Sequence, residues 1–321
     1  MSIIYRPLRE SDYAILAELL NDSSVADGRA QRQVADELRE EFESHPVSLD
    51  NHTLAAWNDG QLVGVIYAYY LPSEERELRC YLFGTVAPSF RGRGIGRHLL
   101  AWGEHTAAGL LRSSPSDLPR YVRVDTPRAN TSAIRLYERV GLVPIRYFAD
   151  LRLRLAQPAA PVATGTTGVR IVPWDLARNH EALTVKNSAF EDHWGSTPMT
   201  PEWWESKTSG FGSRADWSYF ALNDADEIVG FLLTHRYEAD DELLGGTYAW
   251  VDNIGTLKHW RGRGVATSLL TTAIARYRSE GLDFAALGVD SDNPTGAYRL
   301  YESVGFAPWR QTVTYQRVIG A

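Results

Sequence analysis

Two short stretches of glycine and arginine carry the residues best suited to chemistry. Arg91-Gly92-Arg93-Gly94-Ile95-Gly96 returns 170 positions later as Arg261-Gly262-Arg263-Gly264-Val265-Ala266. Glycine lets a ligand approach the main chain, and a helix that begins there points free N–H groups and a partial positive charge at one spot. Such a turn can hold a phosphate or pyrophosphate. A Gly/Arg turn can also merely connect two elements, so the stretch alone leaves both interpretations open.

Other Gly-rich phosphate motifs fit these two stretches poorly. A P-loop ends in Gly-Lys-Ser/Thr, and neither copy does. The dinucleotide fingerprint needs a third glycine where Arg97 and Thr267 stand. Both copies also lie inside periodic apolar segments, which is not the setting of a Gly/Arg-rich RNA-binding tail.

The segments around the two stretches predict the elements that hold them. An apolar strand precedes each copy, in RCYLFGTV and TYAWVDNIGT. After the second copy Val265, Leu269 and Ala273 recur every four residues, which predicts a helix with one buried face. A further strand follows, and then a short helix that begins after Asn130 or Asn293.

The order of elements repeats in the two halves of the 321-residue chain. Each half is predicted to be β-α-β-β-β-α-β-α-β. The Pro/Ala/Thr/Gly-rich residues 157–168 are predicted to be a linker between domains at 1–156 and 169–321. We therefore predict an α/β protein with two tandem domains, each a mixed central sheet flanked by helices.

Charge and composition exclude several classes of protein. A net charge of -7 argues against a nucleic-acid partner. The start MSIIYRPLRE lacks a secretory pattern, and no apolar run is long enough for a membrane span. Cys80 is the single cysteine, so neither an intramolecular disulfide nor a Cys-based zinc site is expected, and no metal site is predicted. We expect a cytoplasmic protein, with its oligomeric state left open.

The combined motifs closely resemble the GCN5-related N-acetyltransferase superfamily. Its acetyl-CoA signature, Arg/Gln-x-x-Gly-x-Gly/Ala, is matched in both stretches. The family's Asn…Leu-Tyr…Gly ending matches Asn130 with Tyr137, and Asn293 with Tyr301, although the second copy has one extra residue after Asn. The second half looks most like tandem members of the mycothiol synthase and antibiotic-cluster type.

This resemblance implies direct transfer of an acetyl group from acetyl-CoA to the amine of a small-molecule acceptor. The two turns would hold the pyrophosphate, and a main-chain N–H near Val86 or Thr256 would stabilise the oxyanion. Tyr137 or Tyr301 would give a proton to the departing thiolate. The implied cofactor-binding residues are Val86, Arg91 to Gly96, Asn130, Tyr137, Thr256, Arg261 to Ala266, Asn293 and Tyr301.

A carboxylate in one half distinguishes the two predicted sites. Trp250 and Asp252 share one face of the strand before the second turn, and the equivalent positions in the first half are Cys80 and Leu82. The acceptor amine must lose a proton. We therefore predict that Asp252 is the base, or positions a water that is, and that the second half is catalytic. The alternative is that Asp252 caps a turn or pairs with an arginine.

Two other functions are compatible with the sequence. One or both halves could bind CoA in a regulatory role without transferring an acetyl group, and the first half is the better candidate because it lacks the acid. Acetylation of a protein N-terminus or lysine is a further alternative, although nothing in the sequence specifies a peptide groove.

Overall fold

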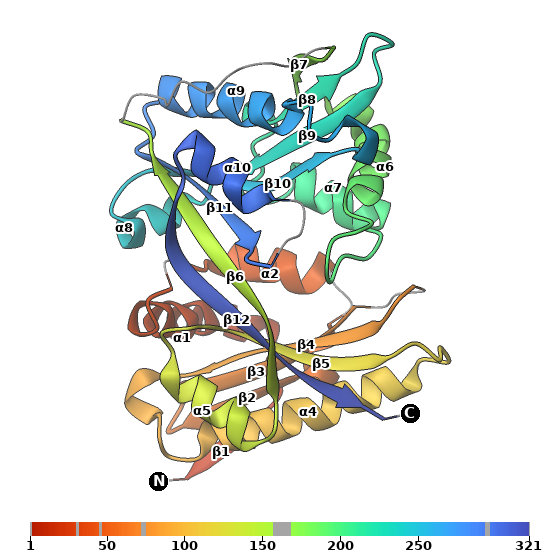
Figure 1. Ribbon diagram of the computed structural model, residues 1–321. Coiled ribbons are helices and arrows are strands. Elements are labelled where there is room, and N and C mark those ends of the chain that lie inside the picture. Colours follow the sequence, from red (N-terminus) through yellow and green to blue (C-terminus); the bar gives the residue numbers. More distant parts are fainter. Residues whose placement is uncertain are drawn as a thin grey trace. The chain divides into compact units, whose positions relative to one another are not determined.

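The chain forms two compact units, one of Met1–Tyr147 with Gln311–Ala321 and one of Phe148–Arg310. The computed structural model in Figure 1 describes residues 2–29, 32–44, 47–71, 75–156, 168–292 and 296–320. Residues 157–167 of the predicted linker therefore lie outside the described residues. The units differ from the predicted ranges 1–156 and 169–321 only in the last strand of each half.

Unit 1 contains a mixed sheet in the order β1-β2-β3-β4-β5-β12. Neighbouring strands are antiparallel except β4 and β5, which are parallel. The strands are β1 (Ile3–Arg6), β2 (Thr53–Asn58), β3 (Gln61–Leu71), β4 (Leu78–Val86), β5 (Arg120–Pro127) and β12 (Ala307–Ile319).

Unit 2 repeats this arrangement in the order β6-β11-β10-β9-β8-β7. Here β10 and β11 form the one parallel pair among the described registers. The strands are β6 (Val143–Arg154), β7 (Arg170–Pro173), β8 (Tyr219–Leu222), β9 (Ile228–His235), β10 (Tyr248–Thr256) and β11 (Phe284–Asp290). The mixed sheets confirm the predicted fold class.

The two halves of the sequence exchange their last strands. The end of β6, from the first half, pairs with β11 from Phe148↔Asp290 to Arg154↔Phe284. The end of β12, from the second half, pairs with β5 from Thr312↔Pro127 to Ile319↔Arg120. Each sheet is thus completed by a strand from the other half of the sequence, which explains why the compact units differ from the predicted ranges.

Helices cover both faces of each sheet (Figure 1). In unit 1, α4 and α5 lie on one side and α1 and α2 on the other; in unit 2, α9 and α10 lie on one side and α6 and α7 on the other. The helices are α1 (Tyr13–Ala26), α2 (Ala35–Ser44), α3 (Leu49–His52), α4 (Ile95–Ser113), α5 (Thr131–Arg139), α6 (Asn179–Ala189), α7 (Pro201–Ser209), α8 (Asp241–Leu244), α9 (Val265–Ser279) and α10 (Ala297–Val304).

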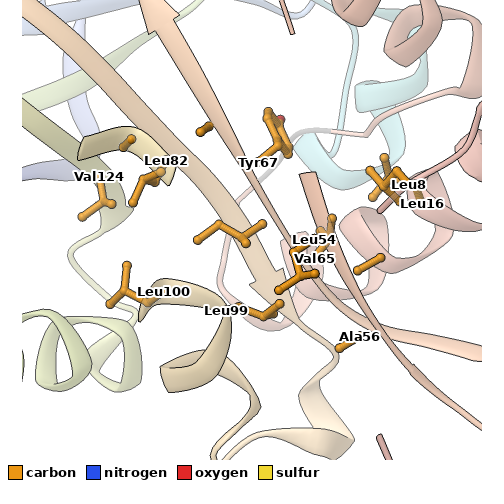
Figure 2. Packing of buried hydrophobic residues seen from close by; sticks show 14 of the residues in the cluster. Leu8, Leu16, Leu54, Ala56, Val65, Tyr67, Leu82, Leu99, Leu100 and Val124 are labelled. Atoms are coloured by element: carbon orange, nitrogen blue, oxygen red, sulfur yellow. The ribbon is translucent and has the colours of Figure 1, made fainter. Parts of the chain in front are cut away.

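Apolar burial fixes each signature turn against its sheet. In unit 1, Leu99 and Leu100 of α4 pack into the same core as Val65, Leu82 and Val124 of the strands (Figure 2). In α9 of unit 2 the predicted apolar face, Val265, Leu269 and Ala273, is at most 2% exposed. The start of each long helix is therefore held firmly at the end of β4 or β10.

Candidate active site

The signature turn of unit 1 presents unobstructed main chain. Gly92 and Gly94 have φ of 75° and 85°, and a Cβ built on either would meet nothing within 4 Å. Gly94 is the N-cap of α4 and supplies no side-chain cap, so the first N–H groups of the helix have no partner within it. Free N–H groups at the start of a helix are the kind of donor that binds a phosphate.

Unit 2 repeats the turn with the same backbone. Gly262 and Gly264 have φ of 74° and 78°, and Gly264 is the uncapped N-cap of α9. Val265 is buried, while Gly262 and Arg263 are exposed. Both copies therefore have the same left-handed glycine turn and the same uncapped helix start.

The first arginine of each turn holds the turn in place from behind. Arg91 donates from Nε to the Val86 carbonyl at 2.9 Å, and its guanidinium forms two hydrogen bonds to the Asp27 carboxylate at 2.6 and 3.1 Å. Arg261 donates to the carbonyls of Thr256 and Ala189 at 3.3 and 2.8 Å. These hydrogen bonds fix the position of each turn relative to the end of the preceding strand.

The second arginine of each turn is exposed and stacks on an aromatic ring. The Arg93 guanidinium lies 5.0 Å from the Phe90 ring centroid, and that of Arg263 lies 4.8 Å from the Trp260 ring centroid. Both side chains reach solvent beside the glycine turn. They remain candidates for direct contact with a phosphate.

Each parallel strand pair separates halfway along its length. β4 pairs with β5 only from Leu78↔Arg120 to Tyr81↔Arg123, although both strands continue. β10 pairs with β11 only from Tyr248↔Phe284 to Val251↔Leu287. The sheet of each unit therefore opens just before its signature turn.

The main chain at the end of each opened strand offers a hydrogen-bond donor. The N–H of Ala87 donates to Val63 on β3, and the N–H of Leu257 donates to Val229 on β9. Because successive N–H groups of a strand point to opposite sides, those of Val86 and Thr256 point away from β3 and β9, toward the opening. This is where the predicted oxyanion donors are needed.

The tyrosines of the Leu-Tyr motif lie on the short helices α5 and α10, where Tyr137 is partly buried and Tyr301 is buried. Burial raises the pKa of Tyr137 and of Tyr301 to about 12, so each phenol keeps its proton at neutral pH. Asn130 caps α5 by accepting from the N–H of Ala133 at 3.1 Å, which accounts for its place in the motif. Asn293 lies outside the described residues.

Asp252 lies at a β-bulge that unit 1 lacks. The register between β9 and β10 shifts between Val251 and Asn253, so Asp252 is the extra residue. The register between β3 and β4 is continuous, and Leu82 there is buried in the apolar core. The difference between the halves that the sequence indicated is therefore also a difference in backbone.

An ion pair with Lys207 on α7 fixes the Asp252 carboxylate. The two groups are 2.7 Å apart, and the Asn253 amide donates to the same Oδ2 at 2.6 Å. Burial raises the pKa of Asp252, but the Lys207 and His235 charges and these hydrogen bonds outweigh burial and hold the pKa below 3.8. Asp252 thus pairs with a lysine, where the sequence alternative was an arginine or a turn cap.

Two further basic residues of unit 2 were missed by the sequence interpretation. His235 ends β9 with its Nδ1 3.8 Å from Asp252 Oδ2. Lys186 on α6 is 4% exposed, and burial together with the charge of Lys207 lowers its pKa from 10.5 to about 8. The one signal for His235 was a titratable residue at the end of an otherwise apolar strand.

A cavity of about 800 Å³ borders the signature turn of unit 2 on its α6 side. Its lining includes Trp260 and Arg263 but neither Asp252 nor Tyr301. The lining residues are His180, Glu181, Thr184, Val185, Asn223, Glu227, Ile228, Val229, Leu257, His259, Trp260 and Arg263.

Across the described ranges, no cluster of His, Cys, Asp and Glu is arranged to hold a metal ion. In the same part of the chain, no helix has the length and apolar character needed to cross a membrane.

Comparison with known proteins places both halves in one family. A model of the acetyltransferase (GNAT) family matches residues 15–142 and 180–306. A mycothiol acetyltransferase of Thermobispora bispora is 31% identical over 271 residues, which cover 82% of this chain and 83% of the relative. One of Actinosynnema mirum is 28% identical over 94% of both chains.

Solved structures agree with this assignment. A GCN5-related N-acetyltransferase of Sphaerobacter thermophilus has a TM-score of 0.77 and 26% identity, with 99% of this chain and 96% of that chain covered. A tandem GNAT protein from the clavulanic acid biosynthesis pathway has a TM-score of 0.72 at 18% identity, which shows a shared fold over 100% of this chain and 99% of that chain.

Proposed function

Because the chain belongs to the acetyltransferase (GNAT) family and is an N-acetyltransferase, we propose that it moves an acetyl group from acetyl-CoA to the amine of a small molecule, and that unit 2 is the catalytic unit. The observation that carries this proposal is the opened β10–β11 pair, where the Thr256 N–H, the cradle of Gly262 and Gly264, and Asp252 belong to one continuous segment. Unit 1 has the cradle and the opening but an apolar leucine in place of the carboxylate.

The residues of unit 2 fit acetyl-CoA. The turn from Gly262 to Ala266 supplies N–H groups and a helix N-terminus for the pyrophosphate, and exposed Arg263 adds positive charge. Acetyl-CoA supplies a thioester carbonyl that an amine can attack. The N–H of Thr256 donates to the oxygen on which negative charge develops.

Asp252 and Tyr301 transfer the two protons that the reaction moves. Asp252 accepts a proton from the acceptor's ammonium group, so that the nitrogen has a free lone pair. Tyr301 stays protonated because burial raises its pKa to about 12, so its hydroxyl can donate to the departing sulfur. Together they let the amide form while the thiol leaves neutral.

The relatives indicate which acceptor to try first. Proteins 31% and 28% identical to this chain are named mycothiol acetyltransferase. The form of mycothiol that lacks the acetyl group is therefore the first amine to test, followed by a panel of small amines that includes amino sugars.

Thiol release tests the proposal directly. The wild-type protein is mixed with acetyl-CoA and each amine, and free CoA is measured alongside acetyl-CoA binding by calorimetry. We expect binding together with amine-dependent thiol release, and Asp252→Asn should lower that release. An Asp252→Asn protein that keeps its full rate at every pH would contradict the role of Asp252.

Unit 1 supports a second function for part of the molecule. Its cradle is intact at Gly92 and Gly94, whereas Leu82 stands where unit 2 has a carboxylate. A CoA-binding, regulatory role fits these features. Binding by the wild-type protein without turnover of any amine would favour this function for the whole chain.

A further inference from the structure

Asp252 lies next to a buried histidine, His235, whose Nδ1 can accept a proton. His235 is 4% exposed, and its Nδ1 has no hydrogen-bond partner among the described residues. The nearest acidic atom is Asp252 Oδ2 at 3.8 Å, too far for a hydrogen bond. A buried polar atom without a partner is rare and costly, which points to a function for this one.

The surroundings of His235 act on its charge in opposite directions. Burial disfavours the charged imidazole, whereas the Asp252 carboxylate and the main chain of Lys207 favour it. The relay described below uses the neutral tautomer that carries its hydrogen at Nε2 and its lone pair at Nδ1, on the side of Asp252.

Asp252 alone does not readily keep the proton that it takes from the acceptor. Its carboxylate is held ionised by Lys207 at 2.7 Å, and the Asn253 amide occupies the same oxygen. The Asp252 side chain is 18% exposed and can be reached from outside, whereas Nδ1 of His235 cannot. A proton that arrives at Asp252 therefore has one buried acceptor of higher basicity beside it.

We propose that Asp252 and His235 form a proton relay, in which Asp252 takes the proton of the acceptor's ammonium group and, once the 3.8 Å gap closes to hydrogen-bond distance, passes it to Nδ1 of His235. This inference rests on the proposed function. The N–H bond of the ammonium breaks as an O–H bond forms on Asp252, and that bond breaks as an N–H bond forms on the imidazole. After transfer the imidazolium returns its proton through Asp252 to solvent. His235 acts through Asp252 and is a positioning residue.

The charged groups around His235 set the pH at which the relay works. Asp252 approaches from β10, Lys207 from α7, and the Tyr237 ring stacks 5.9 Å away; Lys186 on α6 interacts electrostatically with Lys207. Burial lowers the pKa of His235 below 6.5, with the Lys207 charge assisting and Asp252 opposing. The relay therefore needs a neutral imidazole and fails as the pH falls through this lowered pKa.

Three variants test the relay in the full chain. His235→Gln should lower kcat/KM for the amine about 100-fold at pH 7. The ratio of wild-type to variant kcat/KM, in which titration of the amine itself cancels, should fall as the pH drops below 6.5. His235→Asn places an amide near Nδ1 that can accept a hydrogen bond but cannot hold a proton, and it should behave like His235→Gln. The matched control His105→Gln changes an exposed residue of α4 and should match wild type.

The outcomes distinguish failure of the relay from failure of the proposed function. Acetyl-CoA affinity and thermal stability establish that a variant is folded, and if His235→Gln fails to fold, His235→Asn decides. A folded His235 variant that keeps the wild-type rate and pH profile overturns the relay. A wild-type protein that binds acetyl-CoA but releases no thiol with any amine overturns the proposed function instead.

Discussion

Asp252 is a partly buried carboxylate whose charge depends on Lys207. The two side chains are 18% and 25% exposed, so solvent screens their attraction only in part. Removing one partner of such a pair leaves the other charge poorly compensated. The free energy of unfolding of unit 2 should therefore depend on whether Asp252 is ionised.

Lys207→Met should destabilise unit 2 by roughly 2 kcal/mol at neutral pH. The pKa of Asp252 is lower in the folded protein than in the unfolded chain. The ionised carboxylate therefore stabilises the fold above about pH 3.9, and this stabilisation is lost as the pH falls through the pKa of Asp252 in the folded protein. The difference between wild type and variant should vanish in the same range. Urea unfolding from pH 3 to 8 measures it.

Lys258→Met is the control for this prediction. The Lys258 side chain is 77% exposed and lies 3.3 Å from Asp192, so its loss should change stability by less than about 0.5 kcal/mol. Equal losses for the two variants, or a Lys207→Met loss that does not shrink as the pH falls below about 3.9, would contradict the ion pair as the stabilising contact.

Lys186→Met should stabilise the protein at neutral pH. Among the described residues, the buried ammonium donates to the Asn187 amide oxygen at 3.2 Å and lies 5.8 Å from the Phe190 ring centroid. Because its pKa falls from 10.5 to about 8 on folding, charging it in the folded state costs on the order of 3 kcal/mol below pH 8. The gain in stability should disappear above pH 10.5, where Lys186 is neutral in both the folded and the unfolded protein. The free energy of unfolding of wild type and variant at pH 7 and 10.5 measures this gain. A variant that is less stable than wild type at pH 7 would refute the prediction.

At the scale of elements, the turns that begin α4 and α9 depend on glycine. The left-handed φ of Gly94 costs an alanine about 1 kcal/mol. A Cβ there would also project into the open space that the cradle presents. An alanine substitution at a second glycine of the same conformation, away from the turn, separates the backbone cost from the loss of ligand binding.

Gly94→Ala should weaken acetyl-CoA binding in unit 1, and Gly60→Ala should not. Gly60 in the β2–β3 hairpin has φ of 82° and equally open surroundings, so it bears the same backbone cost. Calorimetry of wild type should give two sites per chain, and of Gly94→Ala one. Equal binding by both variants would show that the turn does not hold the ligand.

The sequence predicted these elements well because their signals are local. The order of strands and helices follows from periodicity, and the position of the turn follows from its glycines. The contact of Lys207 with Asp252 joins residues 45 positions apart in the sequence, and no local pattern indicates it. The bulge at Asp252 was missed for the same reason, since it depends on the pairing with β9.

In the whole molecule, the exchanged strands make each sheet depend on both halves of the sequence. Val313 and Tyr315 of β12 lie in the core of unit 1. Gln316 accepts from Arg123 at 2.9 Å, and Thr314 donates to Asp125 at 2.5 Å. The sequence could not predict the exchange, because β6 and β12 have similar alternating patterns and either could complete either sheet.

Deleting residues 311–321 should therefore destabilise unit 1, although these residues belong to the second half of the sequence. The deletion exposes the edge of β5 and removes two buried side chains from the core. Amide hydrogen exchange should accelerate in β5 and stay unchanged in β9. Faster exchange in β9 and β10 instead would show that the strand supports unit 2.

If acetyl transfer takes place in unit 2, the paired variants Tyr301→Phe and Tyr137→Phe should differ in activity. Each removes one hydroxyl of raised pKa from the same motif position. With acetyl-CoA and an amine that wild type turns over, Tyr301→Phe should lose about 100-fold in kcat, and Tyr137→Phe should retain it. A loss confined to Tyr137→Phe would place the chemistry in unit 1 and contradict the claim.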